Sequence, residues 1–123
     1  MRIIKPIPYY KTIPFHKAGK RVDLIFHENT NYIGYYIKKE LVGISGYEVL
    51  KTKAILRSAY VLPLYRRQGI YDEFIIYTKH ILSKKNINII EATCTADSLY
   101  YHLFRGAKII KQFKNFTKIR YTL

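Results

Sequence analysis

The chain has 123 residues, a formal net charge of +14 and an apolar fraction of 49%. This length suits one domain, and the apolar fraction is enough for a packed core, which excludes wholesale disorder. No apolar run approaches the roughly 20 residues of a membrane-spanning helix, and the first residues lack the apolar segment of a secretory signal. The single cysteine, Cys94, excludes an internal disulfide and a cysteine-built zinc site. We therefore expect a cytoplasmic protein, in the host cytoplasm if a phage encodes it, with no membrane partner.

The basic excess comes from 22 Lys and Arg residues against 8 Asp and Glu residues. It favours polyanionic partners such as nucleic acid, an acidic protein surface or a cofactor with several phosphates. No acidic residue follows Asp97, whereas six basic residues do: Arg105, Lys108, Lys111, Lys114, Lys118 and Arg120. Abundant lysine, isoleucine and tyrosine also fit a gene of biased base composition, so both explanations of the charge stay open.

We expect one domain over residues 1–123, with a short and irregular amino-terminal part at residues 1–30 that the sequence defines poorly. Pro6, Pro8 and Pro14 forbid a long helix there, because proline lacks a backbone N–H and clashes with the preceding turn. Residues 22–26 fit a strand or a helix equally well.

Three β-rich segments follow the amino-terminal part. They cover residues 32–37, 41–50 and 54–62, with turns at residues 38–40 and 51–53. β-Branched and aromatic residues dominate these segments, as is typical of strands. Pro63 ends the third strand, because it cannot donate a hydrogen bond to a neighbouring strand.

The clearest helix is predicted over residues 70–85. Ile70, Phe74, Tyr77 and Ile81 recur at the spacing that places side chains on one helix face. Acidic residues in the first turn and basic residues near the end complement the helix dipole.

Beyond this helix we predict a buried strand, a short helix and a closing hairpin. They cover residues 87–94, residues 98–105, and residues 108–113 with 117–123. Thr95 or Asp97 caps the short helix, and Gly106 ends it. A strand, a helix and a further strand make a right-handed crossover between parallel neighbours. The predicted fold class is therefore α/β, with a mixed sheet and helices on its faces.

The segment at residues 61–71 has the pattern of an anion site. A strand stops at Pro63, two arginines follow, and Gly69 stands at the mouth of the long helix. The first turn of a helix has unpaired N–H groups and a partial positive charge. Gly69 lets the backbone approach a phosphate closely, and Arg66 and Arg67 add attraction. An ordinary strand-to-helix turn with solvent-facing arginines is the alternative.

The string Val-x-Pro-x-Tyr-Arg-x-x-Gly-Ile, from Val61 to Ile70, resembles the acetyl-CoA loop of the GNAT N-acetyltransferase superfamily. The resemblance covers roughly residues 32–123. Residues 98–108 look like the family's later motif, which usually has a Leu-Tyr pair, then Gly-Phe and a basic residue. The resemblance implies a mostly antiparallel sheet whose central parallel strand pair splays at the cofactor site, with helices on both faces.

This resemblance implies a transferase that moves an acetyl group from acetyl-CoA (coenzyme A) to an amine, which attacks the thioester directly. Backbone N–H groups of residues 67–71 would hold the pyrophosphate, and the strand edge at residues 60–62 would pair with the pantetheine arm. The implied cofactor-binding residues are Tyr60, Val61, Leu62, Arg66, Arg67, Gln68, Gly69, Ile70 and Tyr71. The sequence departs from the family at Tyr71, where Gly or Ala is usual.

Four residues are candidates for proton transfer. His102 stands where the family often has a tyrosine that protonates the thiolate, and Tyr101 precedes it. Glu48 and Glu91 are strand carboxylates able to act as a base. Each of the four also has an ordinary structural explanation, as does Cys94 in the core.

Five tyrosines fit an acceptor pocket, base stacking or ordinary strand packing: Tyr9, Tyr10, Tyr32, Tyr35 and Tyr36. The four histidines lack metal-ligand spacing, so no metal is expected.

The acceptor amine stays unknown, although the short amino-terminal part favours a macromolecule over a small molecule. Two further functions stay open. One is a phage-type protein that modifies DNA bases on a GNAT-like fold, which the charge would suit. The other is a basic module that binds nucleic acid or protein without catalysis. The sequence is compatible with a monomer or a homodimer.

Overall fold

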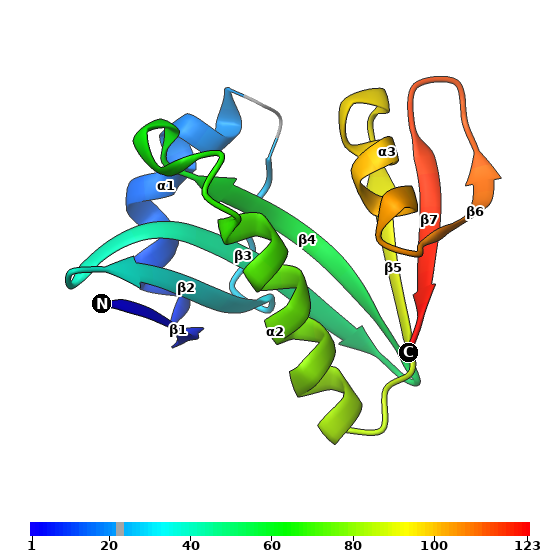
Figure 1. Cartoon of the computed structure of the whole chain (residues 1–123), viewed down its shortest axis with the longest axis horizontal. Coiled ribbons are helices and arrows are strands. Elements are labelled where there is room, and N and C mark those ends of the chain that lie inside the picture. The colour runs from blue at the N-terminus through cyan, green and yellow to red at the C-terminus, as the bar shows by residue number, and fades with distance from the viewer. Residues whose placement is uncertain (22–23) are drawn as a thin grey trace. The chain divides into compact units, whose positions relative to one another are not determined.

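The computed structural model describes residues 1–21 and 24–123, which form seven strands and three α-helices (Figure 1). The strands are β1 (Arg2–Ile7), β2 (Asn31–Ile37), β3 (Glu40–Leu50), β4 (Lys53–Val61), β5 (Ile89–Cys94), β6 (Lys108–Gln112) and β7 (Thr117–Thr122). The helices are α1 (Ile13–Lys20), α2 (Ile70–Lys84) and α3 (Ala96–Phe104), with short 3₁₀ turns at η1 (Tyr9–Thr12) and η2 (Pro63–Tyr65). No helix in the described part is both long and apolar enough to cross a membrane.

All seven strands belong to one sheet, in the order β1-β2-β3-β4-β5-β7-β6. β4 and β5 are parallel, whereas β1 with β2, β2 with β3, β5 with β7 and β6 with β7 are antiparallel. The chain divides into two compact units. Unit 1 comprises Met1–Glu48 and Arg57–His80, and unit 2 comprises Val49–Leu56 and Ile81–Leu123.

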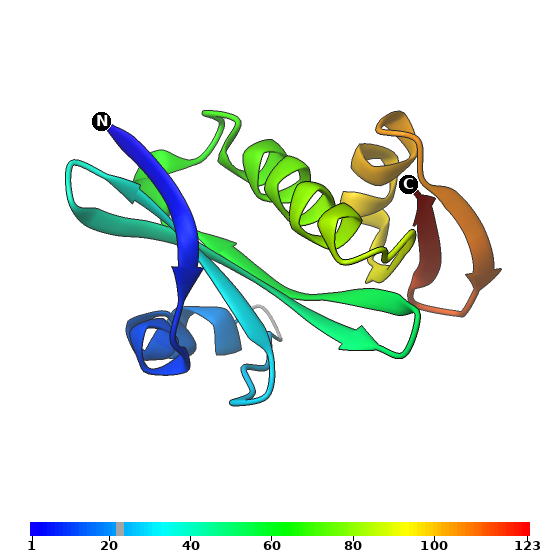
Figure 2. The same ribbon diagram turned by 90° about the horizontal axis from the view of Figure 1, so that it is seen from below.

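In unit 1, the first helix and the long helix lie on opposite faces of the strands (Figure 2). On the α2 face, the rings of Tyr35 and Phe74 meet edge to face with centroids 5.9 Å apart. Gly43 leaves room for this packing, because a Cβ there would lie 3.3 Å from the Phe74 ring. The opposite face buries Phe15 of α1 in a cluster with Tyr32 and other apolar residues. Each face of the sheet therefore has its own apolar core.

In unit 2, β5 is the central strand. Its first three residues pair with Lys53, Ala54 and Ile55 of β4, and its whole length pairs with β7. β6 pairs with β7 at the edge of the sheet, and all five of its residues are exposed. The register shifts between Ile109 and Lys111, which marks a bulge. Bulges and lysines are common protections of edge strands against unwanted pairing.

The structure confirms the predicted fold class and every predicted element from residue 32 onward, with small shifts of their ends. Gly106 has a φ of 98° at the end of α3, as a helix-ending glycine should. The buried stripe of α2 differs from the predicted one. Thr78 and Leu82 are buried, whereas Tyr77 and Ile81 are only half-buried.

The prediction that residues 1–30 are irregular is wrong for β1 and α1. Proline is tolerated in both because Pro6 lies in an edge strand and Pro14 in the first turn of a helix. The undecided segment at residues 22–26 falls partly outside the described residues, since residues 22 and 23 are not described. Residues 24–26 have no regular structure.

Candidate functional site

The loop between η2 and α2 has an unusual backbone conformation. Arg67 and Gly69 have φ values of 64° and 78°, in the left-handed region. A left-handed conformation is routine for glycine and costs an arginine about 1 kcal/mol or more. Left-handed residues next to ordinary ones turn successive N–H groups toward one side, which makes a concave site for anions. The loop therefore has the backbone pattern that an anion site requires.

Backbone N–H groups in this loop remain available. Within residues 1–21 and 24–123, no backbone carbonyl accepts a hydrogen bond from the N–H of Arg67, Gln68 or Gly69. The helix begins where Glu73 donates its N–H to the Gly69 carbonyl, 3.1 Å away. All three loop residues are exposed, so these N–H groups are open to solvent or to a ligand. A Cβ at Gly69 would meet no atom within 4 Å. Space for an anion is therefore present beside the loop.

Three other predicted cofactor residues, Arg66, Tyr60 and Val61, contact one another. Arg66 Nε donates to the Val61 carbonyl over 2.9 Å, and its guanidinium lies 5.2 Å from the centre of the Tyr60 ring. The Leu62 N–H is already used, because it donates to the Val42 carbonyl. The predicted strand edge at residues 60–62 is thus partly satisfied within the chain, and a pantetheine arm would share the Val61 carbonyl with Arg66.

The first two helix residues, Ile70 and Tyr71, differ in exposure. Ile70 is buried, with 2% of its surface exposed, so it anchors the start of α2 in the core. Tyr71 is half-buried and has interactions of its own.

Gln68 accepts a hydrogen bond from Arg2 of β1 over 2.7 Å. Arg2 lies far from the loop in sequence, and no sequence pattern predicted its contribution.

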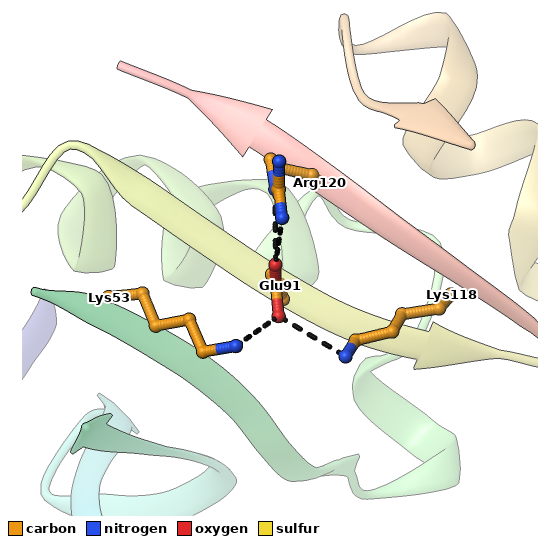
Figure 3. A network of polar contacts seen from close by, with 4 residues as sticks. All are labelled: Lys53, Glu91, Lys118 and Arg120. Atoms are coloured by element: carbon orange, nitrogen blue, oxygen red, sulfur yellow. Dashed lines mark hydrogen bonds and ion pairs between the residues drawn. The ribbon is translucent and has the colours of Figure 1, made fainter. Parts of the chain in front are cut away.

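Glu91 is buried, with only 1% of its side chain exposed, and it contacts three basic side chains (Figure 3). Its Oε1 lies 2.9 Å from Lys53 Nζ and 3.4 Å from Lys118 Nζ, while Oε2 accepts from Arg120 Nη2 over 2.6 Å. Burial opposes the charge, but these hydrogen bonds outweigh it and lower the pKa of Glu91 to about 2. A carboxylate so occupied is a weak base, so the geometry favours a structural role.

Glu48, the other candidate base, is also engaged in ion pairing and hydrogen bonding. Its Oε2 accepts from Arg57 Nη2 and its Oε1 from the Thr30 hydroxyl, each over 3.1 Å. The bond from Arg57 lowers the pKa of Glu48. Glu48 belongs to unit 1 and Glu91 to unit 2. Each carboxylate is neutralised within its own unit.

The two candidate acids on α3 differ in exposure. His102 is buried, with 3% exposed, and its Nδ1 lies 2.5 Å from the Tyr121 hydroxyl on β7. Tyr101 is half-buried, and the Arg105 guanidinium lies 3.9 Å from the centre of its ring. A proton donor must reach the reacting atom, so the exposure favours Tyr101 over His102.

Cys94 is 2% exposed, and burial raises the pKa of its thiol. A buried thiol with a raised pKa is a poor nucleophile, so Cys94 fits the role of a small core residue.

Among the described residues, no group of three or more His, Cys, Asp or Glu side chains is arranged to hold a metal ion. The predicted tyrosines divide between core and surface, from Tyr35 at 1% exposed to Tyr10 at 65%.

The lowered pKa of Glu91 predicts part of the acid sensitivity of the fold. Despite its burial, the surrounding cations lower the pKa of Glu91 from its ordinary 4.5 to about 2 in the folded chain, so the carboxylate stabilises the fold above about pH 4.5. That contribution is lost as pH falls toward 2, and the shift corresponds to on the order of 3 kcal/mol. Glu91→Gln should lower the free energy of unfolding by several kcal/mol at pH 7 and flatten its fall below pH 5, as measured by urea titration.

Glu48→Gln is the matched control for this change. Its pair with Arg57 is partly exposed, so about 1 kcal/mol or less should be lost. Equal losses for the two variants would contradict the structural role of Glu91.

Comparison with known proteins reveals similarity at the level of structure. No protein-family model matches the sequence, and no curated protein matches it. The PaiA N-acetyltransferase of Thermoplasma acidophilum, solved with coenzyme A, has a TM-score of 0.84 at 11% identity, covering 100% of this chain and 99% of that one. The ribosomal-protein-S18-alanine N-acetyltransferase of Escherichia coli has a TM-score of 0.83 at 12% identity, covering 99% and 94%.

A GNAT family acetyltransferase from Elizabethkingia anophelis, with acetyl-CoA bound, has a TM-score of 0.74 at 11% identity, covering 99% of this chain and 98% of that one. These proteins share the architecture of this chain over nearly its whole length, while few residues are identical. The chain therefore has the fold of the GNAT N-acetyltransferases.

Proposed function

We propose that the chain is an acetyl-CoA-dependent N-acetyltransferase. The proposal depends on one observation above all: the N–H groups of Arg67, Gln68 and Gly69, before α2, donate to no backbone carbonyl in the part of the chain that the structure describes. Several proteins of the same fold were solved with coenzyme A or acetyl-CoA bound. In this proposal the diphosphate of the cofactor accepts hydrogen bonds from these N–H groups. The exposed Arg67 side chain adds an opposite charge beside them.

The proposed reaction is direct transfer. The amine nitrogen attacks the thioester carbonyl, the N–C bond forms and the C–S bond breaks, the amine loses a proton and the departing thiolate gains one. Glu91 and Glu48 both hold lowered pKa values through their cationic partners, which makes them poor bases. We therefore propose that the amine gives its proton to water, and that Tyr101 protonates the thiolate.

Gly69 gives the most specific test of cofactor binding. A leucine side chain at position 69 would enter the open space beside the three N–H groups and exclude a diphosphate. Gly69→Leu should raise the Kd for coenzyme A at least a hundredfold in isothermal titration, because most of the diphosphate contacts would be lost. The fold should persist, with a loss of about 1 kcal/mol from backbone strain.

Gly106→Leu is the matched control. Gly106 also has a positive φ, 98°, and open space around its Cβ position, so the backbone strain is similar. Its affinity for coenzyme A should stay close to that of the unmodified chain. Unchanged binding by Gly69→Leu would show that the loop does not hold the cofactor.

Phenylalanine variants of Tyr101 and of its neighbour Tyr100 distinguish acid catalysis by Tyr101 from a general effect on α3. Tyr101→Phe should lower kcat about a hundredfold, with little change in the Kd for coenzyme A, because one proton-transfer group is lost. Tyr100 is 80% exposed, and Tyr100→Phe should leave kcat unchanged. Thiol release from acetyl-CoA, with short peptides bearing free amino termini as acceptors, measures the rate. An equal kcat for both variants would remove Tyr101 from the mechanism.

The β6–β7 hairpin favours a second candidate function, binding of single-stranded nucleic acid. Phe113 and Phe116 stack with centroids 4.6 Å apart and are each 41% exposed. Lys108, Lys111 and Lys114 accompany them, and no acidic residue lies between position 98 and the end of the sequence. Exposed rings among basic side chains suit bases and phosphates.

A salt titration with fluorescent oligo(dT) tests this second function. The double variant K111Q/K114Q should weaken binding and lower the slope of log Kd against log salt by about one to two. K17Q/K20Q removes the same charge from α1 and should keep the slope. Equal slopes for both double variants would show that the hairpin is not the binding surface.

A further inference from the structure

Four polar side chains in unit 1 connect the first strand to the start of α2. Arg2 of β1 donates to Gln68 Oε1 over 2.7 Å and to the Tyr35 hydroxyl over 3.3 Å. The Tyr35 hydroxyl in turn donates to the Glu73 carboxylate. The contacts therefore link Gln68, whose N–H is one of those assigned to the diphosphate, to Glu73 in the first turn of α2. We propose that Arg2 and Tyr35 are positioning residues for the cofactor loop, an inference that depends on the proposed function.

Arg2 helps to hold the loop in one conformation. Gln68 lies between Arg67 and Gly69, the two left-handed residues, and all three are exposed. An exposed loop with a strained arginine loses entropy when it is held in one conformation. The hydrogen bond from Arg2 ties the Gln68 side chain to the sheet. It therefore favours the loop conformation that leaves the N–H groups open before a ligand arrives, which strengthens binding.

Arg2 and Tyr35 also control the charge of Glu73 beside the loop. Glu73 lies in the first turn of α2, where an acid stabilises the free helix but repels a bound anion. Tyr35 is only 1% exposed, so its hydroxyl holds the Glu73 carboxylate at the sheet. Burial and the neighbouring carboxylate raise the pKa of Tyr35, so the phenol keeps its proton and remains a donor. The positive charge of Arg2 offsets the negative charge of Glu73. Together they reduce the repulsion that a diphosphate would meet.

Loss of Arg2 should therefore weaken cofactor binding in two ways. Arg2→Ala frees Gln68 and leaves Glu73 less neutralised. We expect the Kd for coenzyme A to rise about tenfold, the typical effect of losing hydrogen bonds made by a charged group. Pantetheine lacks the diphosphate, so its Kd should not change. The full chain is used, with any affinity tag at the carboxyl end so that Arg2 is undisturbed.

Lys5→Ala is the matched control, since it removes an equal charge from the same strand, where Lys5 lies 4.9 Å from the centre of the Tyr36 ring. Its Kd for coenzyme A should change less than twofold.

A double-mutant cycle isolates the charge effect, because adding Glu73→Gln to Arg2→Ala should restore part of the lost affinity. Tyr35→Phe should weaken coenzyme A binding as Arg2→Ala does, while preserving the packing of the ring on Phe74.

The outcomes separate this inference from the proposed function. If the unmodified chain does not bind coenzyme A, the proposed function fails and the positioning role fails with it. If the chain binds, and Arg2→Ala and Lys5→Ala have equal effects, the function stands and the positioning role is overturned. A parallel loss of coenzyme A and pantetheine binding in Arg2→Ala would also overturn it, because that pattern indicates general structural damage.

Discussion

The proposed function depends on backbone N–H groups that find no backbone partner among the described residues. A helix start always has unpaired donors, but most are covered by a capping side chain or by solvent. Here two left-handed residues, Arg67 and Gly69, extend the donor set into the loop before α2. The strand before the loop and the buried Ile70 after it fix where these donors lie. A diphosphate has the charge and the oxygen atoms to satisfy them, whereas a neutral ligand does not.

The carboxylates of the chain show how environment separates residues of one type. Glu91 is buried and bound to three basic side chains, so it joins β4, β5 and β7 within unit 2. Glu73 is exposed and is held by Tyr35 beside the loop. Lys53, Lys118 and Arg120 thus have a role within the fold. One carboxylate offsets one of these three positive charges, so the cluster keeps a net charge of +2.

Much of the fold could be predicted because its elements have strong local patterns. The strands from residue 32 onward, the helix at α2 and the turn at Gly106 all follow from side-chain periodicity and from glycine and proline placement. The strand β1 could not be predicted, because Pro6 argues against a strand unless its edge position is known. The motif predicts the loop, but it does not predict the side chains from other strands that contact the loop region. Arg2 and Tyr35 contact the loop region from strands that are distant in sequence. Glu91 is a candidate base in the sequence because its three basic partners lie far from it along the chain, so the sequence alone does not show that they pair.

A crystal structure of the chain with coenzyme A tests the central claim most directly. The account predicts diphosphate oxygens within about 3 Å of the backbone nitrogens of Arg67, Gln68 and Gly69. It also predicts that the loop keeps the left-handed conformations of Arg67 and Gly69. A cofactor whose diphosphate lies elsewhere, with these nitrogens bound only to water, would contradict the account.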